Sequence, residues 1–353
     1  MKYNNSYKQT RKQYLDVLRA FATIGVIFIH VSANNWYGYI GSANWITFSI
    51  YEGLFKVSVP IFFMISGCLF LNSNKEKSVK ELFSHSIFRL LIFLIFWSIV
   101  YKLVQFPQNE LSLGKNIQNI LMEILKGDTQ SHLWFVYAII GMYLIVPLLR
   151  SSVQNSERKT LLYIIVICIV LGSICDFTTQ FTQLDILSNN LNKIKSGFSV
   201  GYIGYFLLGA YIDKYDIKPK QRLLLYILGF IGTLTTIILV IKDCISTQTI
   251  NERFWSYTMP GLYLSSIAVF LAIKNLNYSD GILLKTMTGI SKKSLGIYGI
   301  HFLFIIILWK AGLTTFSFVG VLSVPVISMI VLGASFISST LIGKMPFCGK
   351  YLA

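Results

Sequence analysis

The stretch YLDVLRAFATIGVIFIHVS, residues 14–32, has the character of a helix that crosses a membrane. The residues after Arg19 are almost wholly apolar, and basic residues crowd the segment before it. A run of about twenty predominantly apolar residues is the length that spans the hydrocarbon core of a bilayer. The sequence therefore predicts that the chain enters a membrane close to its N-terminus.

Two residues of this stretch, Arg19 and His30, are poorly suited to hydrocarbon. They are eleven residues apart, which is close to three helical turns, so they share one helix face about 16 Å apart along the axis. An ionisable residue inside a membrane span is costly and suggests a functional site. The alternative is that Arg19 extends to the inner interface and His30 lies at the outer one.

The composition extends the membrane assignment to the whole chain. Of the 353 residues, 54% are hydrophobic and 13% are charged, and the mean hydropathy is +0.62. A soluble protein carries roughly twice that share of charged residues. We therefore predict an all-α polytopic membrane protein. The net charge of +16 is expected in loops on one side of the bilayer, with no nucleic-acid partner.

Hydropathy predicts about ten transmembrane helices. Pro60 and Pro325 lie within the second and tenth, so we expect a kink or tilt in each. The predicted spans are Tyr14–Val31, Trp45–Leu71, Ser86–Val104, Leu133–Leu149, Leu161–Ile174, Phe198–Ile212, Leu223–Ile241, Tyr257–Ile273, Ser294–Trp309 and Phe316–Ile342.

The basic residues predict the orientation of these spans. The N-terminal arm, the loops at 72–89, 150–160, 213–222 and 274–293, and the C-terminal tail hold about 22 of the 31 basic residues, and the opposite loops hold about eight. Cytoplasmic loops carry an excess of Lys and Arg. We therefore expect both termini in the cytoplasm, Arg19 near the cytoplasmic face and His30 toward the outside.

The second span contains further polar residues. Glu52 and Lys56 are one turn apart, so mutual pairing is the simplest way to lower the cost of burying them. Glu52 has an alternative role, in which its carboxylate holds the ring of His30. Ser66 and Gly67 fall near the depth of Arg19, and a Ser-Gly pair permits close approach either of another helix or of a ligand.

Other polar residues fall at the ends or the middle of later spans. Arg89 opens the third span, where it either sets topology or binds an anion. His132 and Trp134 begin the fourth span at its outer end, and Trp134 suits an interfacial position. His301 is expected to be a buried neutral histidine, hydrogen-bonded to a neighbouring helix. The five cysteines form no metal-binding spacing, so we expect no metal site.

Four stretches taken together resemble the integral-membrane acyltransferase-3 family: RAFATIGVIFIH, VPIFFMISGCLF, HLWFVYAIIGMYLIVPLL and SLGIYGIHFLF. They occur in the family's order along nearly the whole chain. The resemblance implies a single integral-membrane acyltransferase domain over residues 1–353, in a bacterial plasma membrane. It also implies an enzyme that moves an acyl group, usually acetyl, from cytoplasmic acyl-CoA to a hydroxyl of a cell-surface glycan or lipid-linked sugar.

The resemblance carries over to particular residues. Arg19 and His30 match the family's Arg and His, with His30 as the expected general base. The coenzyme is expected to contact Arg19, Arg89 and the pair Ser66–Gly67, with Lys292 or Lys293 as further phosphate partners. The acceptor is expected to contact Glu52, His132 and Trp134.

A transporter or flippase is the opposing hypothesis. A membrane domain that resembles this family is attached to serine racemases in some resistant bacteria, where transport is supposed. Many carriers contain corresponding broken helices in two inverted repeats. The sequence shows no such pair apart from the Pro-containing second and tenth spans, so the enzyme is favoured.

Overall fold

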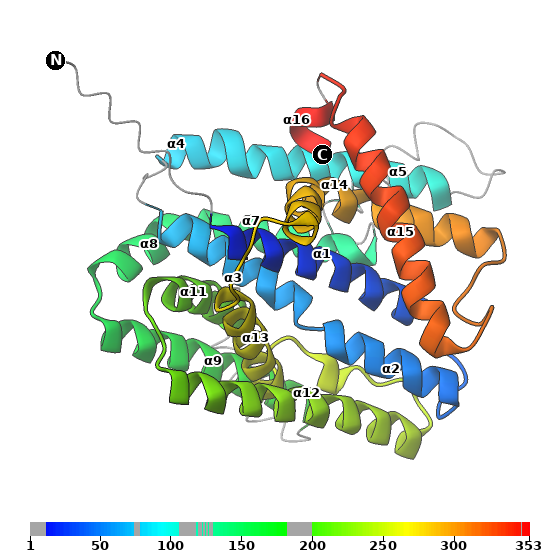
Figure 1. The fold of residues 1–353 in the computed structure, drawn as a ribbon, viewed down its shortest axis with the longest axis horizontal. Coiled ribbons are helices and arrows are strands. Elements are labelled where there is room, and N and C mark those ends of the chain that lie inside the picture. The colour runs from blue at the N-terminus through cyan, green and yellow to red at the C-terminus, as the bar shows by residue number, and fades with distance from the viewer. Residues whose placement is uncertain are drawn as a thin grey trace.

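The computed structural model describes residues 12–73, 78–105, 130–181, 200–346 and 348–353, with the isolated residues 118, 122, 124 and 126. All of the regular structure in these residues is helical, without strands (Figure 1). In chain order the elements are α1 (Gln13–Ala33), α2 (Ala43–Phe55), α3 (Ser58–Leu71), α4 (Val79–Glu81), η1 (Leu82–Ile87), α5 (Phe88–Gln105), η2 (Ser131–Leu133), α7 (Trp134–Leu144), α8 (Val146–Asn155), α9 (Arg158–Phe181), α11 (Val200–Lys214), α12 (Pro219–Thr247), η3 (Arg253–Trp255), α13 (Pro260–Lys274), α14 (Ile282–Lys310), α15 (Gly320–Ile342) and α16 (Cys348–Leu352).

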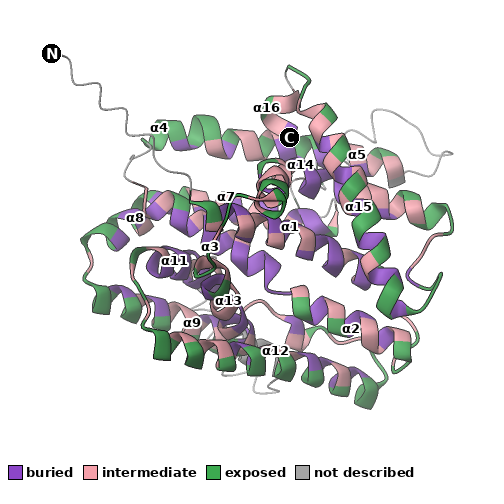
Figure 2. Cartoon of the chain, in the orientation of Figure 1, coloured by how far each residue is buried: buried purple, intermediate pink, exposed green. Residues whose placement is uncertain are grey.

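Helix α1 forms the centre of the bundle. It packs against α2, α3, α13, α14 and α15, and 72% of the residues in its apolar stretch are buried. The corresponding share in α12 is only 22%, although α12 is more hydrophobic than α1. Figure 2 shows the difference, with α12 carrying long exposed faces. Apolar residues exposed along a peripheral helix are what a lipid environment requires.

Seven described segments are long and apolar enough to cross a membrane, and an eighth is obtained if the bent pair of α7 and α8 is one span. The multi-pass all-α class is therefore confirmed. Ten spans and cytoplasmic termini stay predictions. The described part of helix α11 covers most of the predicted sixth span and is 15 residues long.

The predicted boundaries hold best for α1, which extends the predicted first span by one residue at its start and two at its end. The predicted fourth span, Leu133–Leu149, is bent in the structure, because α7 and α8 meet at an angle of 56°. Pro147 lies in the first turn of α8, and because it has no N–H it cannot continue the hydrogen bonds of α7. The predicted loop 274–293 is wrong over most of its length, because α14 begins at Ile282.

Two prolines affect their spans differently. The second span is divided at Lys56 and Val57 into α2 and α3, and Pro60 lies in the first turn of α3. This position accommodates a residue that lacks an N–H, because the first turn has no internal acceptor for it. Pro325 lies inside α15, which continues past it. The second span is therefore interrupted at residues 56–57, and the expected kink or tilt of both spans stays a prediction.

The regions that the charge pattern places on one side of the membrane lie together in space. Lys12 pairs with Asp213 at 2.5 Å, Arg150 donates to the carbonyl of Ser73 at 2.7 Å, and Lys214 donates to that of Val153 at 2.9 Å. Arg89 likewise donates to the backbone oxygen of Ala353. We call this end of the molecule the Arg19 side and the opposite end the His30 side.

Gly67 shows how closely α3 and α11 pack. A Cβ atom at this position would lie 1.8 Å from the carbonyl oxygen of Phe206 on α11. We expect Gly67→Ala to push the two helices apart and to destabilise the protein by about 1–3 kcal/mol, the usual effect of overpacking. Gly141→Ala on α7 is the matched control, because a Cβ there has open space. The apparent melting temperature in detergent is the measurement. Equal melting temperatures for the two variants would contradict this packing role.

Candidate active site

The centre of the candidate site is a hydrogen bond between His30 on α1 and His301 on α14. The Nδ1 atom of His30 lies 2.8 Å from Nε2 of His301. The other ring nitrogen of His301, Nδ1, lies 2.7 Å from the carbonyl oxygen of Tyr298. His301 is fully buried, whereas His30 is half-buried.

These contacts determine the tautomers of the neutral rings. A carbonyl oxygen only accepts, so Nδ1 of His301 must donate to Tyr298. In a neutral imidazole the other nitrogen is then an acceptor, so Nδ1 of His30 donates to Nε2 of His301. His30 is therefore left with an unprotonated Nε2. A general base has this arrangement when one ring nitrogen is fixed by a hydrogen bond and the other is free to accept a proton.

His132, on η2, completes a cluster of three histidines. Its ring centroid lies 5.9 Å from that of His30 and 5.2 Å from that of His301. Phe302 stacks against it at 5.2 Å, and Tyr101 meets it edge-on at 5.0 Å. His132 is buried, and neither of its ring nitrogens has a hydrogen-bond partner among the described residues. Such a buried polar group in a native structure requires an explanation, and a reacting ligand supplies one.

A cavity of about 380 Å³ lies on the Arg19 side of the cluster, and we call it the Arg19 cavity. Its basic lining residues are Arg19, Arg89 and Lys292, and Ser66 lies among them. Phe135 and Tyr298 also line it, and the hydroxyl of Tyr298 donates to the carbonyl of His132. The cavity therefore extends from a basic end to residues that touch the histidine cluster.

Arg89 has a donor atom that is available for a ligand. Its Nη2 atom donates to the backbone oxygen of Ala353 at 2.7 Å, but its Nε atom is buried and has no partner among the described residues. A guanidinium binds carboxylate and phosphate oxygens more strongly than it binds neutral acceptors. The cavity thus offers a buried cationic donor to an anionic ligand.

The structure separates the two members of the predicted Ser-Gly pair. Ser66 lines the Arg19 cavity, whereas Gly67 is buried against the backbone of α11. Close helix packing is therefore the role of Gly67, and contact of Ser66 with a ligand stays a prediction. Of the two lysines considered, Lys292 lines the cavity, and the ammonium of Lys293 lies beside Gly343.

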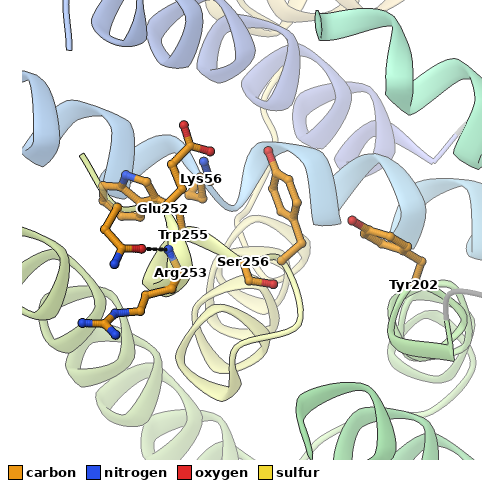
Figure 3. Close-up of a pocket in the computed structure, with 8 residues that line it drawn as sticks. Lys56, Tyr202, Glu252, Arg253, Trp255 and Ser256 are labelled. Carbon is orange, nitrogen blue, oxygen red and sulfur yellow. Dashed lines mark hydrogen bonds between the residues drawn. The ribbon is translucent and has the colours of Figure 1, made fainter. Parts of the chain in front are cut away.

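A second cavity, of about 510 Å³, opens on the His30 side, and we call it the Lys56 pocket (Figure 3). The ammonium of Lys56 lies 5.3 Å from the ring centroids of both Trp255 and Tyr257. Lys56 also interacts electrostatically with His30, which connects this pocket to the histidine cluster. The lining residues are Lys56, Tyr202, Asn251, Glu252, Arg253, Trp255, Ser256 and Tyr257.

The cations of the Lys56 pocket each have a carboxylate partner. Lys56 pairs with Glu52 at 2.9 Å, which confirms the predicted pairing within one turn. Arg253 donates from Nε to Asp243 at 2.9 Å. Glu52 is buried and does not line the pocket, and its second oxygen has no partner among the described residues.

Trp134 does not line the pocket but packs against two aromatic residues that do. Its ring lies 5.4 Å from that of Tyr257 and 5.9 Å from that of Tyr202, both of which line the pocket. Outside the spans, Glu252 accepts a hydrogen bond from the hydroxyl of Tyr37 at 2.8 Å. Burial, together with this hydrogen bond, raises the pKa of Tyr37 to about 12, so the hydroxyl remains a donor.

A family model described as an acyltransferase domain matches residues 12–344. The chain belongs to the acyltransferase-3 family. It is also 28% identical to an amino-acid racemase of Enterococcus faecalis over 149 residues, which is 40% of this chain and 20% of that protein. The chain thus matches only a fifth of that relative's length. No solved structure matches it.

The apolar helices and the family together support a multi-pass membrane protein with an acyltransferase-family domain. Sequence reasoning found His30, His132 and His301 separately but missed that their rings form one cluster. It also missed Tyr298, although Tyr298 and His301 are three residues apart and share a helix face. The described residues contain no group of His, Cys, Asp and Glu arranged to hold a metal ion.

The buried ion pair of Glu52 and Lys56 gives a stability prediction. Lys56→Met should leave the carboxylate of Glu52 buried without its cation and destabilise the protein by roughly 3–5 kcal/mol. Adding Glu52→Leu should restore most of the loss, because both charges are then removed. Apparent melting temperatures of the two single variants and the double variant form the cycle. Additive effects would show that the pair does not couple.

Proposed function

We propose that the protein transfers an acyl group, with acetyl as the first choice, from acyl-CoA to a hydroxyl group of a cell-surface glycan or lipid-linked sugar. The observation that carries this proposal is the hydrogen bond from His30 to His301, which leaves Nε2 of His30 free to accept a proton. Family membership supports the transferase chemistry, and the donor and acceptor are our assignment.

The Arg19 cavity suits the donor. Coenzyme phosphates are too polar for hydrocarbon, so they belong near Arg19, Arg89 and Lys292, where charge-assisted hydrogen bonds are available. A pantetheine arm is long and thin, with a length of the same order as the 16 Å rise from Arg19 to His30. Placed along this face of α1, it brings the thioester to the histidine cluster.

The reaction proposed is direct transfer. The acceptor hydroxyl gives its proton to Nε2 of His30 while its oxygen attacks the thioester carbonyl. The tetrahedral intermediate then expels the coenzyme thiolate, which takes the proton back from His30. His132, with its unpartnered ring nitrogens beside His30, is placed to donate an N–H to the intermediate's oxyanion.

The Lys56 pocket suits the acceptor. Sugars present apolar ring faces and hydroxyl groups, and the pocket offers the rings of Trp255 and Tyr257 with the polar groups of Ser256 and Asn251. Trp134 and Glu52 act behind this surface, through Tyr257 and Lys56, rather than in it. We place the Arg19 side in the cytoplasm and the His30 side outside, as the basic residues predict.

A carrier is the second candidate function. The buried charges of Glu52 and Lys56 would suit a solute pathway, and the partial likeness to a racemase is compatible with a membrane domain that serves another enzyme. Coenzyme turnover distinguishes the two functions, since a carrier consumes no thioester.

The first experiment measures loss of the acetyl-CoA thioester and acetyl transfer to envelope glycans by purified protein in nanodiscs. We expect turnover in wild type and at least a 100-fold loss in His30→Ala, with unchanged coenzyme binding, because general base catalysis typically contributes about 10²–10⁴-fold. His85→Ala is the matched control, because His85 is an exposed histidine on η1.

Three results would revise the proposal. Failure of wild type to bind acetyl-CoA would overturn the donor assignment and favour the carrier. Acyl-His30 formed with donor alone would replace direct transfer by a covalent intermediate. Trp255→Ala should spare coenzyme binding and slow transfer to glycans, and equal loss of both would remove the acceptor role of the Lys56 pocket.

His301 is a positioning residue that acts through His30. His301→Leu removes the acceptor for Nδ1 of His30 and should lower kcat roughly 100-fold, with little change in the KM for acetyl-CoA. His301→Gln should retain most of the activity, because its amide oxygen can occupy the place of Nε2. Equal losses in the Leu and Gln variants would indicate a packing role only.

A further inference from the structure

A second cavity on the Arg19 side, of about 620 Å³, carries an excess of positive charge. We call it the Arg150 cavity. Its charged lining residues are three cations, Lys12, Arg150 and Lys214, and one carboxylate, Asp213. Neither the Arg19 cavity nor the histidine cluster includes these residues.

Arg150 is buried and has no carboxylate partner in the part of the chain that the structure describes. Only 8% of its surface is exposed, and its guanidinium donates to the carbonyls of Phe70 at 2.9 Å and Ser73 at 2.7 Å. With its amide oxygen directed at Arg150, Gln154 accepts two further hydrogen bonds, from Nη2 at 2.9 Å and from Nε at 3.1 Å. All of these acceptors are neutral. The carbonyl of Phe70 lies in the last turn of α3, and it contributes only part of the partial charge of about −0.5 at the C-terminal end of a helix. Burial of such a charge is unfavourable unless an anion joins it.

The other charges do not compensate Arg150. Asp213 is already bound by Lys12 at 2.5 Å, by the hydroxyl of Tyr14 and by the amide of Asn72 at 2.8 Å. Lys214 is exposed, and its one hydrogen bond in the described part of the chain goes to the carbonyl of Val153 at 2.9 Å. Arg150 and Lys214 therefore remain as two cations available to one ligand.

The Arg150 cavity adjoins the Arg19 cavity at the end of α3. Leu69 and Phe70 line the Arg19 cavity, the next three residues line the Arg150 cavity, and Arg150 donates to the carbonyl of Phe70. At 380 Å³, the Arg19 cavity is near the lower end of the range of about 300–1,000 Å³ for drug-sized ligands. Acyl-CoA is larger than such ligands, so part of it must lie outside the Arg19 cavity.

We propose that the Arg150 cavity binds the 3′-phosphate of the donor coenzyme while the acyl-pantetheine arm occupies the Arg19 cavity. This inference rests on the coenzyme assignment of the proposed function. A phosphate monoester carries about −1.5 to −2 charges near neutral pH. The net charge of three cations and one carboxylate matches that charge, which a monoester carries on a single phosphate group. A lipid phosphomonoester has the same chemistry, and the experiment separates the two sources.

The test compares binding of CoA and 3′-dephospho-CoA by isothermal titration calorimetry, with protein in phosphatidylcholine nanodiscs. Wild type should bind CoA roughly tenfold more tightly, which is the effect of one charge-assisted hydrogen bond. Lys214→Gln should reduce this preference to less than about threefold by weakening CoA alone. Lys220→Gln is the matched control, because Lys220 is exposed on the first turn of α12 and does not line the cavity.

Three results would overturn the inference. Equal binding of the two ligands by wild type removes the 3′-phosphate contact and leaves the coenzyme assignment intact. A preference that survives in Lys214→Gln places the phosphate elsewhere. Binding of neither ligand refutes this inference together with the donor assignment. The first result is followed up with phosphatidic acid in the nanodisc. If the lipid raises the melting temperature of wild type but not of Lys214→Gln, the Arg150 cavity binds a lipid phosphate.

Discussion

The chemistry that we propose depends on the hydrogen bond that joins His30 of α1 to His301 of α14. The direction of that bond is set by the backbone of α14, because the carbonyl of Tyr298 accepts from His301 and leaves its Nε2 as an acceptor. One helix thus determines which nitrogen of another helix is basic. The same bond joins two of the closely packed helices of the bundle, so site geometry and helix packing are coupled.

Buried cations have carboxylate partners at one end of the bundle and neutral partners at the other. On the His30 side, Lys56 pairs with Glu52 and Arg253 with Asp243, so both of the pocket's described cations have a carboxylate partner. On the Arg19 side, Arg89 has an unpartnered donor among the described residues, and Arg150 is surrounded by neutral acceptors. Because unpaired buried charge is costly, a positive excess at one end favours an anionic ligand there, and balanced pairs at the other favour a neutral one.

Local spacing predicted the features that a single helix determines. The apolar run predicted α1 to within two residues, and the separation of four residues predicted the pair of Glu52 and Lys56. Prediction failed where one helix depends on its neighbours. Two examples are the bend between α7 and α8 and the early start of α14. Hydropathy alone does not distinguish a straight span from a bent one, or from a helix that continues beyond the apolar core.

By itself the sequence determined the membrane class, the all-helical fold, the placement of Arg19 and His30 on one helix, and the family resemblance. Only the tertiary structure decided that His30, His132 and His301 meet, that Ser66 faces a cavity while Gly67 faces a helix, and that aromatic residues of 255–257 approach Lys56. The physical reason is that helical periodicity fixes which residues share a face. Which faces meet depends on the packing of side chains between helices, and similar apolar surfaces do not specify their partners in advance.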